Sequence, residues 1–282
     1  MKKGLMVTVA LVLGVVVVFA GAKKEGTGTQ QTGTQQTVVK IGLMGEELRP
    51  AWNTVAKALE QDGIKVELVN FSDYAVPNRA LSDGDIDLNS FQHDAFLQNE
   101  IKNQKYDLTA IGNTVIFFLG VYSHKIKSLD ELQDGDTVVI MNDATNGGRA
   151  LKVLEAAGVF TLDPSKGNVP TIQDIVSNPK NIQVVEVDAS QTWRTLDDPQ
   201  VAAAVVNSNF VVDGGGVPAQ DAIYIKPIDK EGDKPYINLL VARTKDKDNP
   251  VYRKVVAAFQ TETVAKVITD EPPLKGTALP AW

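Results

Sequence analysis

The segment from Asn142 to Arg149 holds side-chain amides, a hydroxyl, two glycines and a guanidinium within eight residues. Residues 138–141 form an apolar run typical of a short buried strand, and residues 150–157 carry a helical apolar pattern. The segment between them is therefore predicted to be a strand-to-helix turn, which points backbone N–H groups and the positive end of a helix dipole at an anion. The two glycines would let the backbone approach that anion, and Arg149 can bind a carboxylate with two parallel hydrogen bonds. Asn146 and Arg149 are the candidate ligand-binding residues, although an ordinary helix cap with a surface arginine would have the same sequence.

Two further amides lie in apolar surroundings. Asn207 follows the apolar run 201–206, and Asn238 lies inside the run 236–241. An amide in a buried strand costs stability unless it is hydrogen-bonded. These residues are either satisfied structural amides or partners for the amino and carboxylate groups of a bound amino acid.

Aromatic side chains follow two predicted strands, in the segments 71–74 and 91–93. Side chains beyond strand ends converge on the same edge of a sheet. We therefore expect Tyr74, Phe91 and His93 to form an apolar and aromatic wall of a ligand cleft. Core packing of Tyr74 and Phe91 is the alternative.

Several kinds of chemistry lack candidate residues. The chain has no cysteine, and its two histidines, His93 and His124, lie on different predicted elements, so a thiolate or histidine-rich metal site is not expected. No G-x-S-x-G nucleophile motif is present. The acidic cluster 83–87 is expected to be a solvated turn, since it lacks the ligand spacing of a calcium loop. The sequence thus predicts a protein that is not an enzyme and has no metal or cofactor.

The N-terminal segment is typical of an export signal. Two lysines precede an uncharged apolar run over residues 4–20, and small residues follow up to Ala22. Residues 23–37 have no apolar side chain and are predicted to be a flexible tether with a reach of about 20 Å. Because a tether suits an anchored protein, we expect a lipoprotein, attached to the membrane if the residue at Ala22 is natively a lipid-bearing cysteine. The predicted location is the inner-membrane surface as a lipoprotein, or the periplasm or cell surface.

The remaining chain carries an acidic excess. Residues 23–282 hold 26 basic and 35 acidic residues, a net charge of −9. This charge disfavours a nucleic-acid partner.

Residues 38–282 alternate strand-like and helix-like runs, as in an α/β protein with parallel sheets. The strand-like runs are 38–44, 65–71, 85–89, 108–122, 137–141, 182–187, 202–207, 222–227 and 236–243. The helix-like runs are 52–59, 77–81, 91–105, 128–132, 149–157 and 251–268. We predict two lobes joined by crossing strands, with residues 38–123 in lobe 1, 124–226 in lobe 2, and 227–282 returning to lobe 1 and ending in a helix. Such a clamshell places a ligand cleft between the lobes.

Several long motifs, in the order found here, resemble those of the methionine-binding lipoprotein family, known as MetQ or NlpA. They are FSDYAVPN (71–78), GDIDLNSFQH (84–93), SLDEL (128–132), NDATNGGRAL (142–151), part of 190–198, and PYINL (235–239). The resemblance implies a type II-like periplasmic-binding-protein fold that closes on L-methionine. It also implies delivery of this ligand to the permease and ATPase subunits of an ABC importer.

The matching motif positions imply roles for individual residues. Arg149 would hold the ligand carboxylate, and Asn207 and Asn238 would hold the polar backbone of the ligand. The residues that would surround the thioether chain are Tyr74, Phe91 and His93.

Three features depart from the family pattern. Met141 replaces a common proline, which we expect to affect only strand packing. Glu46, Trp52 and Trp193 differ from the usual residues and are expected to border the cleft and to influence specificity. The missing cysteine at position 22 removes the thiol that an acyl chain would join. Two alternatives follow: a receptor for another amino acid or a dipeptide, and a tethered surface protein that binds another macromolecule.

Overall fold

The computed structural model describes residues 36–229 and 231–282. The predicted signal segment, 1–22, and most of the predicted tether, 23–37, lie outside the described residues. Within the described ranges, no helix combines the length and the apolar character needed to cross a membrane.

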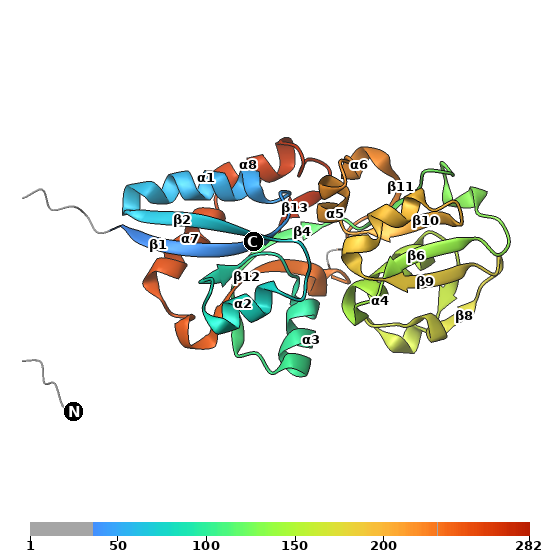
Figure 1. Cartoon of the computed structure of the whole chain (residues 1–282), viewed down its shortest axis with the longest axis horizontal. Helices are drawn as coiled ribbons and strands as arrows, with labels where there is room; N and C mark the ends of the chain where they lie inside the picture. The colour runs from blue at the N-terminus through green and yellow to red at the C-terminus, as the bar shows by residue number, and fades with distance from the viewer. Residues whose placement is uncertain (1–35, 230) are drawn as a thin grey trace, which may run out of the picture. The chain divides into compact units, whose positions relative to one another are not determined.

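The first sheet contains six strands in the order β13-β4-β12-β3-β1-β2 (Figure 1). The strands are β1 (Thr37–Met44), β2 (Ile64–Phe71), β3 (Leu88–Asn89), β4 (Leu108–Phe117), β12 (Ile237–Arg243) and β13 (Ala278–Pro280). β1 pairs in parallel with β2 and β3, whereas β12 and β13 run antiparallel to their neighbours. The expected parallel pairing is present between β1 and its two neighbours, but the sheet is mixed because the returning chain adds antiparallel strands.

Helices cover both faces of this sheet. They are α1 (Arg49–Leu59), α2 (Pro77–Asp83), α3 (Asp94–Gln104), α7 (Pro250–Phe259) and α8 (Glu262–Asp270). Alternate residues of β12 face opposite sides, as in any strand. Leu240 and Ala242 pack in the core under α1, α7 and α8, while Leu239 and Val241 pack in a smaller core with α2 and α3.

The second sheet contains five strands in the order β11-β5-β10-β6-β9. The strands are β5 (Gly120–Tyr122), β6 (Thr137–Met141), β9 (Gln183–Val187), β10 (Val201–Val206) and β11 (Ala222–Ile225). The helices are α4 (Ala144–Ala156), α5 (Ser208–Asp213) and α6 (Pro218–Asp221), and a small sheet pairs β7 (Thr161–Leu162) with β8 (Ile175–Ser177). Every residue of β10 is buried, because this central strand is covered on both faces.

Short 3-10 helices complete the chain. They are η1 (Glu60–Asp62), η2 (Leu129–Glu131), η3 (Pro164–Lys166), η4 (Ile172–Asp174), η5 (Ala189–Gln191), η6 (Trp193–Asp197), η7 (Lys234–Tyr236) and η8 (Thr244–Asp246).

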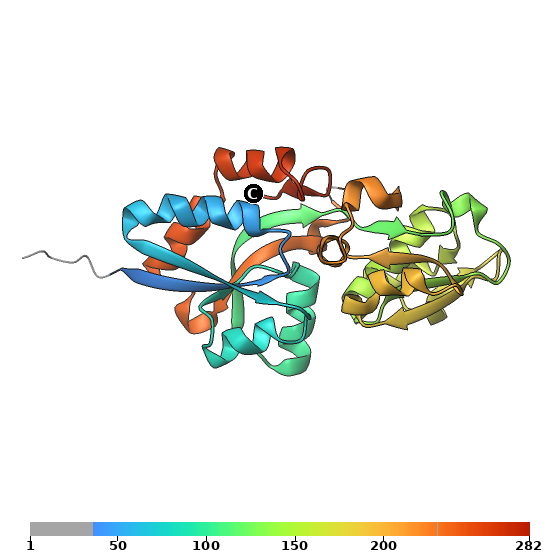
Figure 2. The same cartoon turned by 45° about the horizontal axis from the view of Figure 1, so that its top comes forward.

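The chain passes between the two sheets twice (Figure 2). It leaves the first sheet after Phe117 and enters the second at Gly120; it leaves the second after Ile225 and rejoins the first at Ile237. The lobe limits proposed at 123 and 226 remain predictions. The predicted α/β fold with two lobes is confirmed.

Two predicted helix limits were wrong. The C-terminal run 251–268 is two helices, because the chain turns at Gln260 and the Thr261 hydroxyl caps the second one. The helix expected near Arg149 begins five residues earlier, at Ala144, because the Asp143 carboxylate caps it.

Candidate functional site

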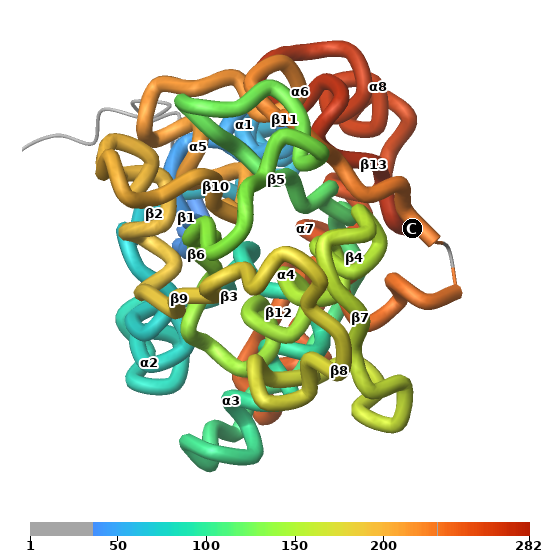
Figure 3. Tube along the Cα trace, turned by 90° about the vertical axis from the view of Figure 1, so that its right-hand side faces the viewer, coloured from blue at the N-terminus to red at the C-terminus, as the bar shows by residue number. Residues whose placement is uncertain are grey.

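A cavity lies between the two lobes, lined by both. It encloses about 590 Å³ of space not occupied by atoms, part of it open to solvent. Figure 3 views the protein from the end at which the second sheet lies. The structure brings seven candidate residues together in this lining: Tyr74, Phe91, His93, Asn146, Arg149, Asn207 and Asn238.

The start of α4 differs from the predicted anion-binding turn. The Asp143 side chain already accepts hydrogen bonds from the backbone N–H groups of Thr145 and Asn146. The two glycines allow other segments of the chain to pack closely against the start of α4. A Cβ on Gly147 would lie 2.6 Å from the carbonyl oxygen of Met141, and one on Gly148 would lie 3.0 Å from the Cα of residue 169. The expectation that these glycines admit a ligand to the backbone was therefore wrong.

Arg149 is a buried cation at the cavity. It lies on the same helical face as Asn146, three residues earlier, and only 7% of it is exposed. One guanidinium nitrogen donates to the carbonyl oxygen of Phe117 at 2.6 Å, and the guanidinium carbon lies 4.6 Å from the ring centre of Tyr236. No carboxylate of the described residues forms an ion pair with it. Burial lowers the pKa of Arg149, but a guanidinium stays charged in proteins. Arg149 is therefore a buried positive charge without a paired carboxylate among the described residues.

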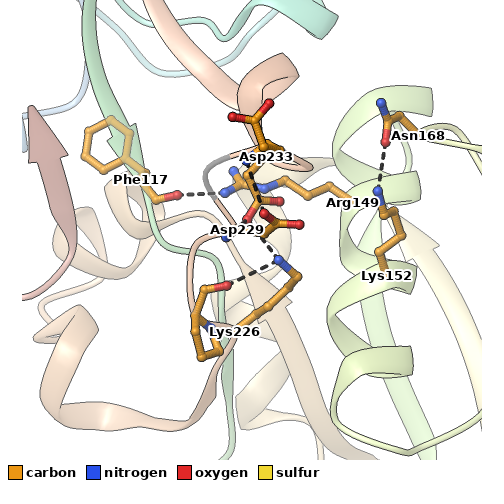
Figure 4. A network of polar contacts seen from close by, with 9 residues as sticks. Phe117, Arg149, Lys152, Asn168, Lys226, Asp229 and Asp233 are labelled. Atoms are coloured by element: carbon orange, nitrogen blue, oxygen red, sulfur yellow. Dashed lines mark hydrogen bonds and ion pairs between the residues drawn. The ribbon is translucent and has the colours of Figure 1, made fainter. Parts of the chain in front are cut away.

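Charged side chains near Arg149 influence its ionisation (Figure 4). Asp233 pairs with Lys226 at 2.8 Å, and the negative charge of Asp233 favours the charged form of Arg149. Lys152, one turn further along α4, donates instead to the side chain of Asn168 at 2.8 Å.

A relay of amides orients the residues near Arg149. The amide nitrogen of Asn146 donates to the Asp143 carboxylate at 3.0 Å, so its oxygen faces the other way. That oxygen accepts from the Asn207 amide at 3.0 Å. Asn146 is thereby satisfied, whereas the side-chain oxygen of Asn207 is buried without a partner among the described residues. Asn207 therefore offers a free acceptor at the cavity.

His93 is held as a neutral imidazole. Burial, helped by the positive charge of Arg149, lowers the pKa of His93 to about 3. Its Nδ1 accepts from the backbone N–H of Phe96 at 3.1 Å, which leaves the proton on Nε2, 3.4 Å from the Asn146 oxygen. The backbone of His93 also bridges to that of Asn238, so the two residues lie side by side in the lining.

Aromatic rings form the apolar wall. Tyr74 contacts Phe91 at 6.0 Å, Phe96 at 5.8 Å and Phe210 at 5.2 Å between ring centres. The Tyr74 hydroxyl donates to Asn209 at 2.8 Å, which joins the two lobes. Sequence reasoning missed Phe96, although its place three residues after His93 in a predicted helix was a usable signal.

The three residues expected to influence specificity lie elsewhere. Glu46 is exposed and hydrogen-bonds to Arg49 and Asn70. Trp52 is fully buried in the first-lobe core, 4.8 Å from the ring of Phe259, because the apolar face of α1 turns it toward the sheet. Trp193 packs against Tyr122 in the second lobe. The expectation that these three side chains border the cleft is corrected accordingly.

Glu47 lines the cavity instead, and sequence reasoning missed it. Ser208 and Asn209, directly after Asn207, line it as well. Six buried side-chain polar atoms of the described residues have no hydrogen-bond partner, and four of them lie in this lining, on Glu47, Ser90, Asn207 and Asn209. A cavity with such groups is suited to a small polar ligand that completes their hydrogen bonds.

Together, the fold and the cavity define a two-lobed solute-binding protein. A model of the NlpA lipoprotein family matches residues 39–282. The D-methionine-binding lipoprotein MetQ of Escherichia coli (strain K12) is 43% identical over 245 residues, which cover 86% of this chain and 88% of that protein. The chain belongs to the NlpA lipoprotein family.

Solved structures agree with this assignment. A nutrient binding protein from Burkholderia cenocepacia bound to methionine is 38% identical, with a TM-score of 0.80 over 86% of this chain and 100% of that one. The substrate binding protein of a methionine transporter from Streptococcus pneumoniae is 35% identical, with a TM-score of 0.79 over 88% and 96% of the two chains. The predicted class, an exported substrate-binding protein of a lipoprotein family rather than an enzyme, is confirmed.

Proposed function

We propose that the cavity binds methionine and that the protein delivers it to the permease and ATPase subunits of an ABC importer. The observation that carries this proposal is Arg149, a buried guanidinium at the cavity without a carboxylate partner in the described chain. A buried charge is costly unless it is paired, so a ligand carboxylate would satisfy it.

The remaining lining fits the rest of an amino acid. The free oxygen of Asn207 and the amide of Asn238 suit the polar backbone of the ligand. The rings of Tyr74, Phe91 and His93 suit a thioether, because sulfur against an aromatic ring contributes about 0.3–1.5 kcal/mol per contact. A neutral His93 is compatible with this apolar role.

Closure around the ligand would follow from the position of the site. A ligand that contacts both lobes stabilises only the closed arrangement, so it shifts the population toward that state. The export signal and tether predicted before residue 38 would hold the protein outside the inner membrane, with a lipid anchor if position 22 is natively cysteine.

Native mass spectrometry of protein purified without added ligand tests the proposal. We expect one methionine per chain, released on denaturation and identified by its mass. Calorimetry on ligand-stripped protein would then compare L-methionine with D-methionine, since the Escherichia coli relative is named for the D form. Recovery of another amino acid or a dipeptide would refute methionine as the ligand, and an empty protein that binds no amino acid would refute the receptor function.

A further inference from the structure

Glu47 is a buried carboxyl group that the proposed site does not yet use. It lies between β1 and α1, is 2% exposed and lines the ligand cavity from the first lobe. Its Oε1 atom has no hydrogen-bond partner among the described residues. A buried polar oxygen without a donor costs free energy, which a ligand donor would recover.

The segment before Glu47 is held against the second lobe. Gly45 has a φ of +57°, and a Cβ there would lie within 2.6 Å of both carboxylate oxygens of Asp213 on α5. The nearby backbone of Glu46 opposes the rise in the pKa of Asp213 that burial causes. The positive φ of Gly45 favours glycine at this turn, which directly precedes Glu46 and Glu47.

Among the described residues, Asp213 is the charged group that affects the pKa of Glu47. Burial, together with the negative charge of Asp213, raises the pKa of Glu47 to about 8, and the nearby Ser208 hydroxyl opposes this shift. Tyr74 and Tyr122 are the other titratable groups whose pKa values are affected by its charge. No ion pair of the described chain includes Glu47. Without ligand, burial and the charge of Asp213 therefore favour the protonated form of Glu47.

The side-chain oxygens of Glu47 and Asn207 that lack hydrogen-bond partners could accept hydrogen bonds from a cationic group. Asn207, whose side-chain oxygen is also unpartnered, directly precedes Ser208, the neighbour of Glu47. We propose that Glu47 is a specificity-determining residue that accepts, together with Asn207, hydrogen bonds from the ammonium group of the ligand. This assignment rests on the proposed function, in which Arg149 holds the carboxylate of the same zwitterion. The neutral carboxyl loses its proton to solvent as the ammonium binds, and the carboxylate formed pairs with the ammonium.

The test compares Glu47→Gln with Glu46→Gln, a matched control at the exposed neighbouring carboxylate. The ligands are L-methionine and 4-(methylsulfanyl)butanoic acid, which lacks only the ammonium group. Titration calorimetry at pH 6.5, in two buffers of different ionisation enthalpy, gives the affinity and the number of protons released. Thermal unfolding of the ligand-free variants checks the fold, and glutamine matches the shape of the protonated carboxyl.

We expect the wild-type protein to release close to one proton per methionine bound. Glu47→Gln should release none and should bind methionine at least about tenfold more weakly, because a hydrogen bond to a charged group is lost. Its preference for methionine over the deaminated acid should shrink by a similar factor, while Glu46→Gln should behave like the wild type.

Methionine binding without proton release, or with unchanged affinity and preference in Glu47→Gln, would overturn this inference alone. A Glu47→Gln variant that instead loses its preference for methionine over norleucine would place Glu47 at the side-chain end and also overturn it. A wild-type protein that binds no methionine would refute the proposed function and the inference with it.

Discussion

Arg149→Met removes the buried positive charge from the cavity while keeping a long apolar side chain. If Arg149 binds the ligand carboxylate through two charge-assisted hydrogen bonds of about 1.5–3 kcal/mol each, the variant loses about 3–6 kcal/mol of binding free energy. The dissociation constant for methionine should therefore rise by about 10²–10⁴-fold.

The ligand-free protein should respond much less. Arg149 makes one hydrogen bond to the Phe117 carbonyl and stacks on Tyr236, but its burial also carries a desolvation cost. Because these contributions oppose each other, the free energy of unfolding should change by no more than about 2 kcal/mol. Arg149 would thus matter for binding more than for folding.

Titration calorimetry and urea denaturation on ligand-stripped protein separate the two effects. Lys152→Met is the control, since it removes a positive charge from the next turn of α4, and Lys152 does not line the cavity between the lobes. An Arg149→Met variant that binds methionine within about tenfold of the wild type would refute the assignment of the carboxylate site.

His93 has a folded-state pKa of about 3 against an ordinary value of 6.5, so folding favours its neutral form. Its contribution to the free energy of unfolding should be lost as pH falls from 6.5 toward 3, and His93→Gln should flatten the pH dependence seen by urea denaturation; an unchanged profile would contradict this. Gly147→Ala should destabilise the fold by about 1–3 kcal/mol, because its Cβ would clash with the Met141 carbonyl oxygen, and an unchanged urea midpoint would argue against that contact. Trp52→Ala should lower the free energy of unfolding by about 3–5 kcal/mol, because it leaves a core cavity beside Phe259, but it should not change methionine affinity. Weaker methionine binding by a folded variant would show that Trp52 contributes to the ligand site.

Much of the architecture could be predicted from local pattern. The runs that became β1, β6 and β10 are apolar because most of their residues are buried, so their composition indicates burial directly. Arg149 and Asn207 also stood out, since a guanidinium beside glycines and an amide after an apolar strand are unusual. The resemblance to the family motifs added the expectation that these segments belong to one two-lobed fold with a ligand cleft.

Other features depended on residues far apart in the chain. The role of Gly148 is set by residues 168–170, which no local pattern around position 148 reveals. The start of α4 was misplaced because an aspartate cap can precede either a turn or a helix. Trp52, expected at the cleft, shares with Val55 and Leu59 one apolar face of α1, and that spacing favours the core over the cleft.

The sequence by itself determined that this is an exported α/β protein with buried strands, an isolated guanidinium and amides in apolar surroundings. Only the tertiary structure decided that Glu47, and not Glu46, enters the cavity. The two carboxyl groups are neighbours in an irregular loop, where no periodicity assigns a direction to a side chain. In the folded protein, the packing of the two lobes buries Glu47, which raises its pKa, while Glu46 stays in solvent.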